Sequence, residues 1–110
     1  MDASATRRLE IGAGHPAFEG HFPGQPILPG VALLAEVLET VAGDLALSAF
    51  VGVAPQVSVV KFLAPVLPGA LLDIAFEPGT RSVSFKVSEG GRVAASGQLA
   101  RLDAPQGTTR

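Results

Sequence analysis

The sequence contains no cysteine, and few of its residues carry a charge. The absence of cysteine excludes disulfide bonds, thiolate catalysis and cysteine-based zinc sites. Charged residues make up only 16% of the chain, with 8 basic against 10 acidic side chains, and no basic run is longer than Arg7-Arg8. Because binding to a nucleic-acid backbone needs a concentrated positive surface, nucleic acid is not an expected partner.

Long hydrophobic runs are also missing. The N-terminus, M-D-A-S-A-T-R-R-L-E, lacks the apolar core of a signal peptide. The longest uncharged stretches are interrupted by proline and glycine, so no membrane span and no membrane partner are expected. These features predict a cytoplasmic protein. A serine hydrolase is not expected, because no G-x-S-x-G motif is present and the serines of the predicted strands lack a partnered histidine.

What the chain does hold is a high content of apolar residues. It is 47% hydrophobic, with a mean hydropathy of +0.40. Its 110 residues correspond to a single domain, residues 1–110, with loose tails predicted at about 1–6 and 103–110. A domain this small leaves much of its surface exposed. The apolar content therefore predicts an apolar subunit interface, most simply in a homodimer or a dimer-based oligomer.

The chain is organised around residues 18–36, F-E-G-H-F-P-G-Q-P-I-L-P-G-V-A-L-L-A-E, which hold three of the nine prolines, three glycines and one of only two histidines. The first half predicts a shaped loop. The apolar run from Val31 predicts a helix of about three turns that ends at Gly43. Pro29 and Gly30 then lie at its N-terminus, where N–H groups and the macrodipole favour negative charge. His21 beside such a pocket suits chemistry on a carbonyl group.

The predicted helix is apolar over most of its circumference. Its polar residues, Glu36, Glu39 and Thr40, form one narrow stripe, whereas Ala35 belongs with the apolar residues. A helix of this kind is expected to be buried on most sides.

The rest of the chain is rich in strand signals. The segment 45–53 is ambiguous between helix and strand, and Val83, Phe85 and Val87 alternate with polar residues before the E-G-G turn at 89–91. One helix followed by an antiparallel meander predicts the α+β class. The predicted strands are 7–13, 56–62, 71–77, 81–88 and 92–102.

Two other motifs involve the N-terminal part of the chain. G-A-G-H-P-A at 12–17 matches a weak dinucleotide pattern, but no helix is predicted to follow it, so nucleotide binding is not expected. His15, Glu19 and His21 have a spacing that is conceivable for a metal site, but a loop broken by prolines gives them no helical register. His15 is therefore interpreted as a solvent-facing loop residue.

The motif G-H-F-P-G-Q-P-I-L-P-G-V at residues 20–31 resembles the signature of the hot-dog-fold 3-hydroxyacyl-acyl-carrier-protein dehydratases, above all their short relatives of aryl-polyene and pigment pathways. The segment K-F-L-A-P-V-L-P-G-A-L-L-D-I (Lys61–Ile74) is similar to a later block of the same family. The resemblance covers residues 9–102. It implies one central helix wrapped by a curved antiparallel sheet, and an acyl chain carried on the phosphopantetheine of a carrier protein or of coenzyme A, with no metal or redox cofactor.

The resemblance also implies roles for individual residues. His21 corresponds to the catalytic base, the backbone N–H of Gly30 to the group that binds the thioester oxygen, and the carbonyl of Ile27 to the group that orients the imidazole. Side chains around this motif are implied to contact the substrate. They are Phe22, Pro29 and Val31.

The acid of these dehydratases is not found at its expected position. In the family it is an Asp or Glu fourteen residues after the histidine, contributed across the dimer interface, and here that position is Ala35. Glu36 is one residue later, which on a helix means a rotation of about 100°. Glu36 is therefore a doubtful catalytic residue and is more simply read as solvated. Glu19 and Asp73 are alternative carboxylates that folding is able to bring to the site.

Three functions follow from this pattern. The first is a dehydratase that eliminates water from a 3-hydroxyacyl thioester, whose acyl chain lies in a tunnel between the helix and the sheet. An acidic carrier protein is expected to dock near the mouth of this tunnel, on Arg81, Lys86, Arg92 or Arg101. The second is a catalytically impaired hot-dog subunit that binds acyl thioesters or pairs with an active dehydratase. The third is a hot-dog acyl thioesterase, against which the G-H-F-P loop argues.

Overall fold

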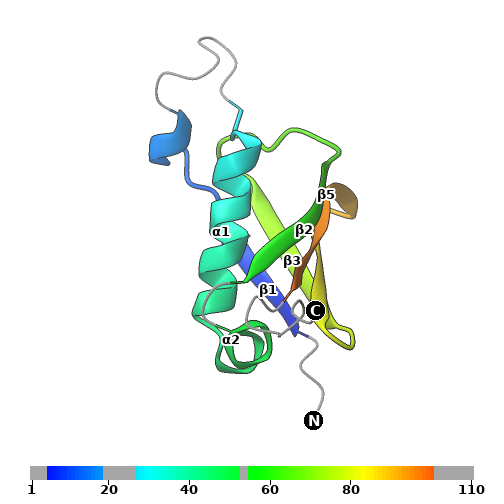
Figure 1. Ribbon diagram of the computed structural model, residues 1–110. Helices are drawn as coiled ribbons and strands as arrows, with labels where there is room; N and C mark the ends of the chain where they lie inside the picture. The colour runs from blue at the N-terminus through cyan, green and yellow to red at the C-terminus, as the bar shows by residue number, and fades with distance from the viewer. Residues whose placement is uncertain (1–4, 19–26, 53–54, 101–110) are drawn as a thin grey trace.

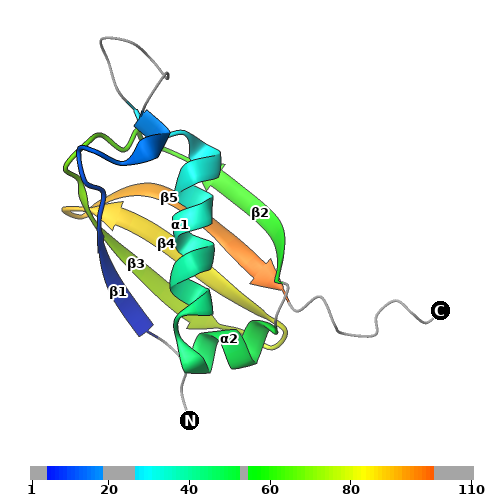
Figure 2. The same ribbon diagram turned by 90° about the vertical axis from the view of Figure 1, so that its left-hand side faces the viewer.

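The computed structural model of the chain describes residues 5–18, 27–52 and 55–100. A single sheet packs against helix α1, which crosses one of its faces (Figures 1 and 2). In chain order the elements are β1 (Ala5–Glu10), the 3-10 helix η1 (Pro16–Phe18), α1 (Gly30–Ala42), α2 (Leu45–Val51), β2 (Gln56–Phe62), β3 (Leu71–Pro78), β4 (Ser82–Glu89) and β5 (Arg92–Ala100).

The sheet has five strands in the order β1-β3-β4-β5-β2, and every neighbouring pair is antiparallel. The predicted turn after β4 is a tight one, in which Gly90 and Gly91 have φ values of 58° and 88° that favour glycine. Strands β1 and β2 form the two edges. The predicted α+β plan of one long helix against an antiparallel meander is therefore confirmed.

The core lies between α1 and the sheet. On β4 the alternation predicted from sequence is confirmed, because Val83, Phe85 and Val87 are at most 2% exposed. The helix contributes Leu33, Val37 and Val41, which follow a spacing of four residues and so form one face. Only one face of the helix meets the sheet.

The prediction that α1 is buried on most sides is wrong for the chain described here. Val31 is 79% exposed, and Ala35 and Ala42 are exposed as well. These residues lie on the side of the helix opposite Leu33 and Val37, where a single sheet provides no cover. The chain therefore leaves an apolar stripe on α1 open.

Two boundaries differ from the sequence predictions. Strand β1 begins at Ala5 and ends at Glu10, because residues 5–10 pair with β3 from Phe76 to Leu71, so residues 5 and 6 are part of the sheet rather than of a tail. The segment 45–53, ambiguous in sequence, contains the short helix α2. The predicted tail at 103–110 and the end of the strand predicted at 92–102 lie outside the described residues.

Asp44 explains why α2 is a helix. Its carboxylate accepts a hydrogen bond from the backbone N–H of Leu47 at 2.9 Å, which caps the helix, and it also pairs with Arg7 of β1. The Leu47 hydrogen bond, with help from the Arg7 guanidinium, lowers the pKa of Asp44. No helix within residues 5–18, 27–52 and 55–100 has the length and hydropathy needed to cross a membrane.

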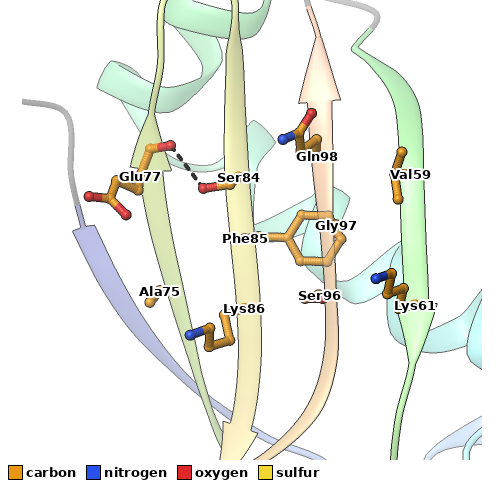
Figure 3. Close-up of a pocket in the computed structure, with 10 residues that line it drawn as sticks. All are labelled: Val59, Lys61, Ala75, Glu77, Ser84, Phe85, Lys86, Ser96, Gly97 and Gln98. Carbon is orange, nitrogen blue, oxygen red and sulfur yellow. Dashed lines mark hydrogen bonds between the residues drawn. The ribbon is translucent and has the colours of Figure 1, made fainter.

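Strand β5 approaches β2 closely at Gly97. A Cβ at this position would overlap the carbonyl oxygen of Val59 and lie 2.7 Å from Cζ of Phe85. Figure 3 shows the Phe85 ring lying across Gly97. The pairing of β2 with β5 is irregular between Val57 and Val59, at the same place. Glycine is required here by space rather than by its φ angle.

Gly97→Ala is therefore expected to lower the free energy of unfolding by about 1–3 kcal/mol, because the added methyl group forces backbone or ring to move. Urea denaturation of the two proteins measures the difference. Gly12→Ala is the matched control, since a Cβ at Gly12 meets no atom within 4 Å. Equal stability of Gly97→Ala and the unsubstituted chain would show that β2 and β5 are not this close.

Candidate active site

The N-terminus of α1 is held against the segment that leads into β3. Leu28 is buried, and its N–H donates to the carbonyl of Val66 at 2.8 Å. Pro29 is the N-cap residue, and its carbonyl accepts from the N–H groups of Ala32 and Leu33, both at 3.0 Å. Proline offers no side-chain acceptor, so the helix start is not capped within the described residues. Its positive end is available to a ligand.

A pocket of about 380 Å³ opens at this helix start. Gly30 forms part of its wall, and the Phe62 ring rests directly against Gly30, where a Cβ would be 2.9 Å from Cζ. The lining is apolar, so the pocket suits a hydrocarbon chain beside the helix N–H groups. The lining residues are Ile27, Leu28, Gly30, Leu33, Phe62, Leu63, Ala64, Pro65 and Val66.

The structure brings some of the predicted site residues together at this pocket. Gly30 and Ile27 line it, and Pro29 lies between them at the helix start. Val31 is 79% exposed and does not belong to the lining. His21 and Phe22 lie outside the described residues, so their predicted roles stay predictions.

Glu36 does not face this pocket but contacts His15. The distance between Oε2 of Glu36 and Nε2 of His15 is 2.7 Å, and the two side chains are only 21% and 22% exposed. The interpretations of His15 as solvent-facing and of Glu36 as solvated are therefore wrong. The 3-10 turn Pro16–Phe18 places the imidazole against α1, a contact between residues far apart in sequence that no local pattern predicts.

The position expected for the acid carries no carboxylate. Ala35 lies on the exposed stripe of α1, about 100° around the helix from Glu36. Asp73, named above as an alternative, pairs with Arg8 at 3.0 Å, and its neighbours Leu72 and Ile74 point into the core. Its side chain therefore lies on the face of the sheet away from α1. Glu19 is outside the described residues.

Of the predicted docking cations, Arg81 and Lys86 lie away from the pocket. Arg81 follows the far end of β3, away from the pocket, and Arg92 pairs with Glu89 at 3.6 Å. Lys86 lies with Lys61 in a hollow of about 460 Å³ on the outer face of the sheet (Figure 3). The prediction that Arg81 lies near the tunnel mouth is wrong, and Arg101 lies outside the described residues.

The surroundings of the pocket are apolar instead. Phe62, the last residue of β2, and Leu63 and Leu67 on the connection to β3 are between 50% and 59% exposed. Such a patch marks a contact surface. The sequence resemblance singled out this block, but no local signal shows that Phe62 covers Gly30. In the part of the chain that the structure describes, no three His, Cys, Asp or Glu side chains gather in a group able to hold a metal ion.

Comparison with known proteins identifies the family. A protein-family model described as ApeI dehydratase, of the ApeI-like type, matches residues 1–98. The chain belongs to the ApeI-like dehydratase family. The resemblance stated from the G-H-F-P-G motif is thereby confirmed.

Individual relatives of this ApeI-like chain agree with the assignment. The 3-hydroxyacyl-(acyl-carrier-protein) dehydratase FabZ of Ruminiclostridium cellulolyticum is 35% identical over 100 residues, covering 81% of the chain and 69% of that protein. FabZ of Acetivibrio thermocellus is 36% identical over 93 residues, covering 76% of the chain and 64% of that protein. The ApeI-like chain therefore spans about two thirds of the length of these relatives.

A solved structure confirms the hot-dog fold. A chain of the dehydratase heterocomplex ApeI:P from Xenorhabdus doucetiae aligns with a TM-score of 0.74 and 26% identity, covering 91% of the ApeI-like chain and 88% of that chain. The predicted fold class, one long helix against a five-stranded antiparallel sheet, is the one observed, although the sheet of a single chain covers only one face of the helix. The residues that the family model matches include all those that line the pocket beside α1.

Proposed function

We propose that this chain is a dehydratase subunit that eliminates water from a 3-hydroxyacyl thioester. The observation that carries the proposal is the apolar pocket at the uncapped N-terminus of α1, at Gly30, in a member of the ApeI-like dehydratase family. The pocket offers an apolar wall for an acyl chain and a positive helix end for the thioester oxygen.

The reaction requires two proton movements. His21 removes a proton from the carbon next to the thioester carbonyl. The hydroxyl group on the following carbon leaves as water, with a proton supplied by the protonated His21 or by a carboxyl group of a second subunit. Negative charge builds on the thioester oxygen meanwhile, and the N–H of Gly30 binds it. The carbonyl of Ile27 holds the imidazole in one tautomer, and Phe22 and Pro29 contact the substrate. This elimination changes no oxidation state overall and needs no redox cofactor.

The substrate is proposed to arrive on a phosphopantetheine arm, either of an acyl carrier protein or of coenzyme A. The FabZ relatives carry the acyl-carrier-protein substrate in their names, which supports the first. The apolar rim formed by Phe62, Leu63 and Leu67 makes apolar contacts the main docking force at the pocket, rather than the cations predicted from sequence.

A second hot-dog subunit is proposed to cover the open side of the chain. Among the described residues strand β2 is an edge of the sheet, in which Val59 is 53% exposed, and the stripe of α1 that contains Val31 and Ala35 is open and apolar. A further apolar hollow, of about 660 Å³, lies between the C-terminal part of α1 and α2, lined in part by Leu38 and Leu45. Pairing of two subunits along β2 buries these surfaces together.

Ala35 favours a second candidate function, that of a subunit completed by a different hot-dog chain. In this arrangement the partner supplies the carboxyl group that Ala35 lacks, and His21 of this chain supplies the base. The largely buried contact of Glu36 with His15 supports this candidate, because it leaves Glu36 unavailable as a substitute acid. The structural relative in a dehydratase heterocomplex supports it as well.

The test is turnover of a 3-hydroxyacyl-carrier-protein substrate, followed by the absorbance of the conjugated enoyl thioester. The purified chain is expected to produce the enoyl thioester, slowly if the acid is missing. Formation of that product only after a second hot-dog subunit is added would select the composite dehydratase. Release of free thiol without an enoyl product would overturn both candidates in favour of a thioesterase.

A further inference from the structure

The face of the sheet away from α1 carries a row of three polar side chains. Lys61 on β2 and Lys86 on β4 are each paired in register with Ser96 of β5, the strand between them. All three point away from the core, because Phe85 and Val87, the neighbours of Lys86 on β4, are buried in it. These three polar residues form the lysine row.

The lysine row lies in the hollow of about 460 Å³ on the outer face of the sheet, with the two lysines on either side of Ser96 (Figure 3). Both lysines are exposed, and only the short side chain of Ser96 stands between them. Gly97, the next residue of β5, also lines the hollow and has no side chain. The floor between the two cations is therefore low enough for the backbone of a partner to approach.

Neither lysine is neutralised by a neighbouring carboxylate. Among the residues that the structure describes, three arginines form ion pairs, whereas Lys61 and Lys86 form none. The one carboxylate that lines the hollow belongs to Glu77, which is paired with Ser84 in the next row of the sheet, two residues along from Lys86. The two positive charges of the lysine row therefore favour a negatively charged partner.

The spacing of the two charges matches an α-helix. Strands β2 and β4 are separated by β5, so the Cα atoms of Lys61 and Lys86 lie about 10 Å apart. In an α-helix, residues i and i+7 are about 10.5 Å apart along the axis and lie on nearly the same side. A helix laid across the strands with acidic residues at these two positions therefore brings one carboxylate to each lysine.

We propose that the lysine row docks an acidic helix of a partner protein, with carboxylates two turns apart. Val59, which is 53% exposed beside Lys61 on the same face, adds an apolar contact. Pairing of a second subunit along β2 leaves this face open, because edge pairing adds strands in the plane of the sheet. Lys61 directly precedes Phe62, whose ring rests on Gly30, so the docked helix lies beside the pocket.

The probe is an alanine-rich helical peptide with two glutamates seven residues apart, added to the full chain labelled with 15N. The backbone amide signals of Lys61, Ser96 and Lys86 are expected to shift, with a Kd of about 0.1–1 mM, since exposed ion pairs contribute little each. Binding is expected to weaken as salt is added. A peptide with glutamines instead, or with the glutamates five residues apart and so about 140° apart around the helix, is expected to bind about 10-fold more weakly.

Variants of the chain test the two charges directly. Lys61→Glu and Lys86→Glu are each expected to weaken binding about 10-fold, because repulsion replaces attraction. Arg81→Glu is the matched control, since it changes the net charge equally at an exposed residue outside the hollow. It is expected to leave the Kd within about twofold, because salt screens exposed charges this far apart. The double variant Lys61→Glu, Lys86→Glu is expected to bind a peptide that has lysines in place of the glutamates.

Binding of that lysine peptide by the double variant supports docking through the two charges. Equal Kd values of the glutamate peptide for the unsubstituted chain and the double variant, or shifts confined to residues outside the hollow, overturn it. If the double variant does not fold, Lys61→Gln with Lys86→Gln is measured instead, and an unchanged Kd there overturns the proposal. None of these measurements uses turnover, so a missing enoyl product would overturn the proposed function and leave the docking result as it stands.

Discussion

Replacement of His21 by asparagine is expected to lower the rate of enoyl thioester formation by about 10²–10⁴-fold, the usual contribution of a general base. Asparagine retains a polar side chain of similar reach but has no nitrogen that accepts a proton near neutral pH. Binding of the acyl chain is expected to persist, since the apolar lining around Leu33 and Phe62 is untouched. The loss is therefore expected in kcat rather than in KM.

The measurement is the initial rate of absorbance change with a 3-hydroxyacyl-carrier-protein substrate, at several substrate concentrations. Where the chain works with a partner subunit, the same assay is run on the reconstituted complex. Glu39→Ala, an exposed change on α1, is the control for expression and handling. A rate of His21→Asn equal to that of the unsubstituted protein would remove His21 from the mechanism.

Introduction of an acid at the position of the missing one is expected to raise activity. Ala35→Asp places a carboxyl group on the open stripe of α1, which the proposed second subunit covers. In an apolar interface the protonated form of a carboxyl group is favoured, so this group is able to donate a proton to the leaving hydroxyl. A gain of up to about 10²-fold is expected in a homodimer that otherwise lacks the acid.

Ala35→Asn is the matched control, since it has almost the same size and polarity but no proton to donate. The two variants are compared in the same turnover assay, with the oligomeric state of each checked by size-exclusion chromatography. Equal rates for aspartate, asparagine and alanine at position 35, in dimers of equal stability, would show that the acid is not delivered from this stripe.

Local elements were predictable from the sequence because their signals are local. Helix α1 was expected from Val31 to the C-cap Gly43 and is found at Gly30–Ala42, since proline and glycine mark both of its ends. Strand β4 was expected from the alternation of Val83, Phe85 and Val87 and is found at Ser82–Glu89. The segment 45–53 was not predictable, because its outcome depends on the Asp44 cap and on packing.

The candidate site was predictable only in part. Gly30 and Ile27 were assigned from a single short motif. Because both lie next to the helix start in the sequence, they also line the pocket there. His15 was assigned wrongly, because its partner Glu36 is reached only after the chain has turned back on itself. The contact of Phe62 with Gly30 joins two separate blocks of sequence in the same way.

The sequence by itself determined the family, the positions of α1 and of strands β2 to β5, and the absence of an acid at Ala35, because each of these is a property of residue identity and short-range spacing. The tertiary structure alone decided which face of α1 is covered, where the carboxylate of Glu36 points and which side of the sheet carries Asp73. These depend on contacts between residues distant in sequence, and the free energy of such contacts is set only when the sheet and helix pack together.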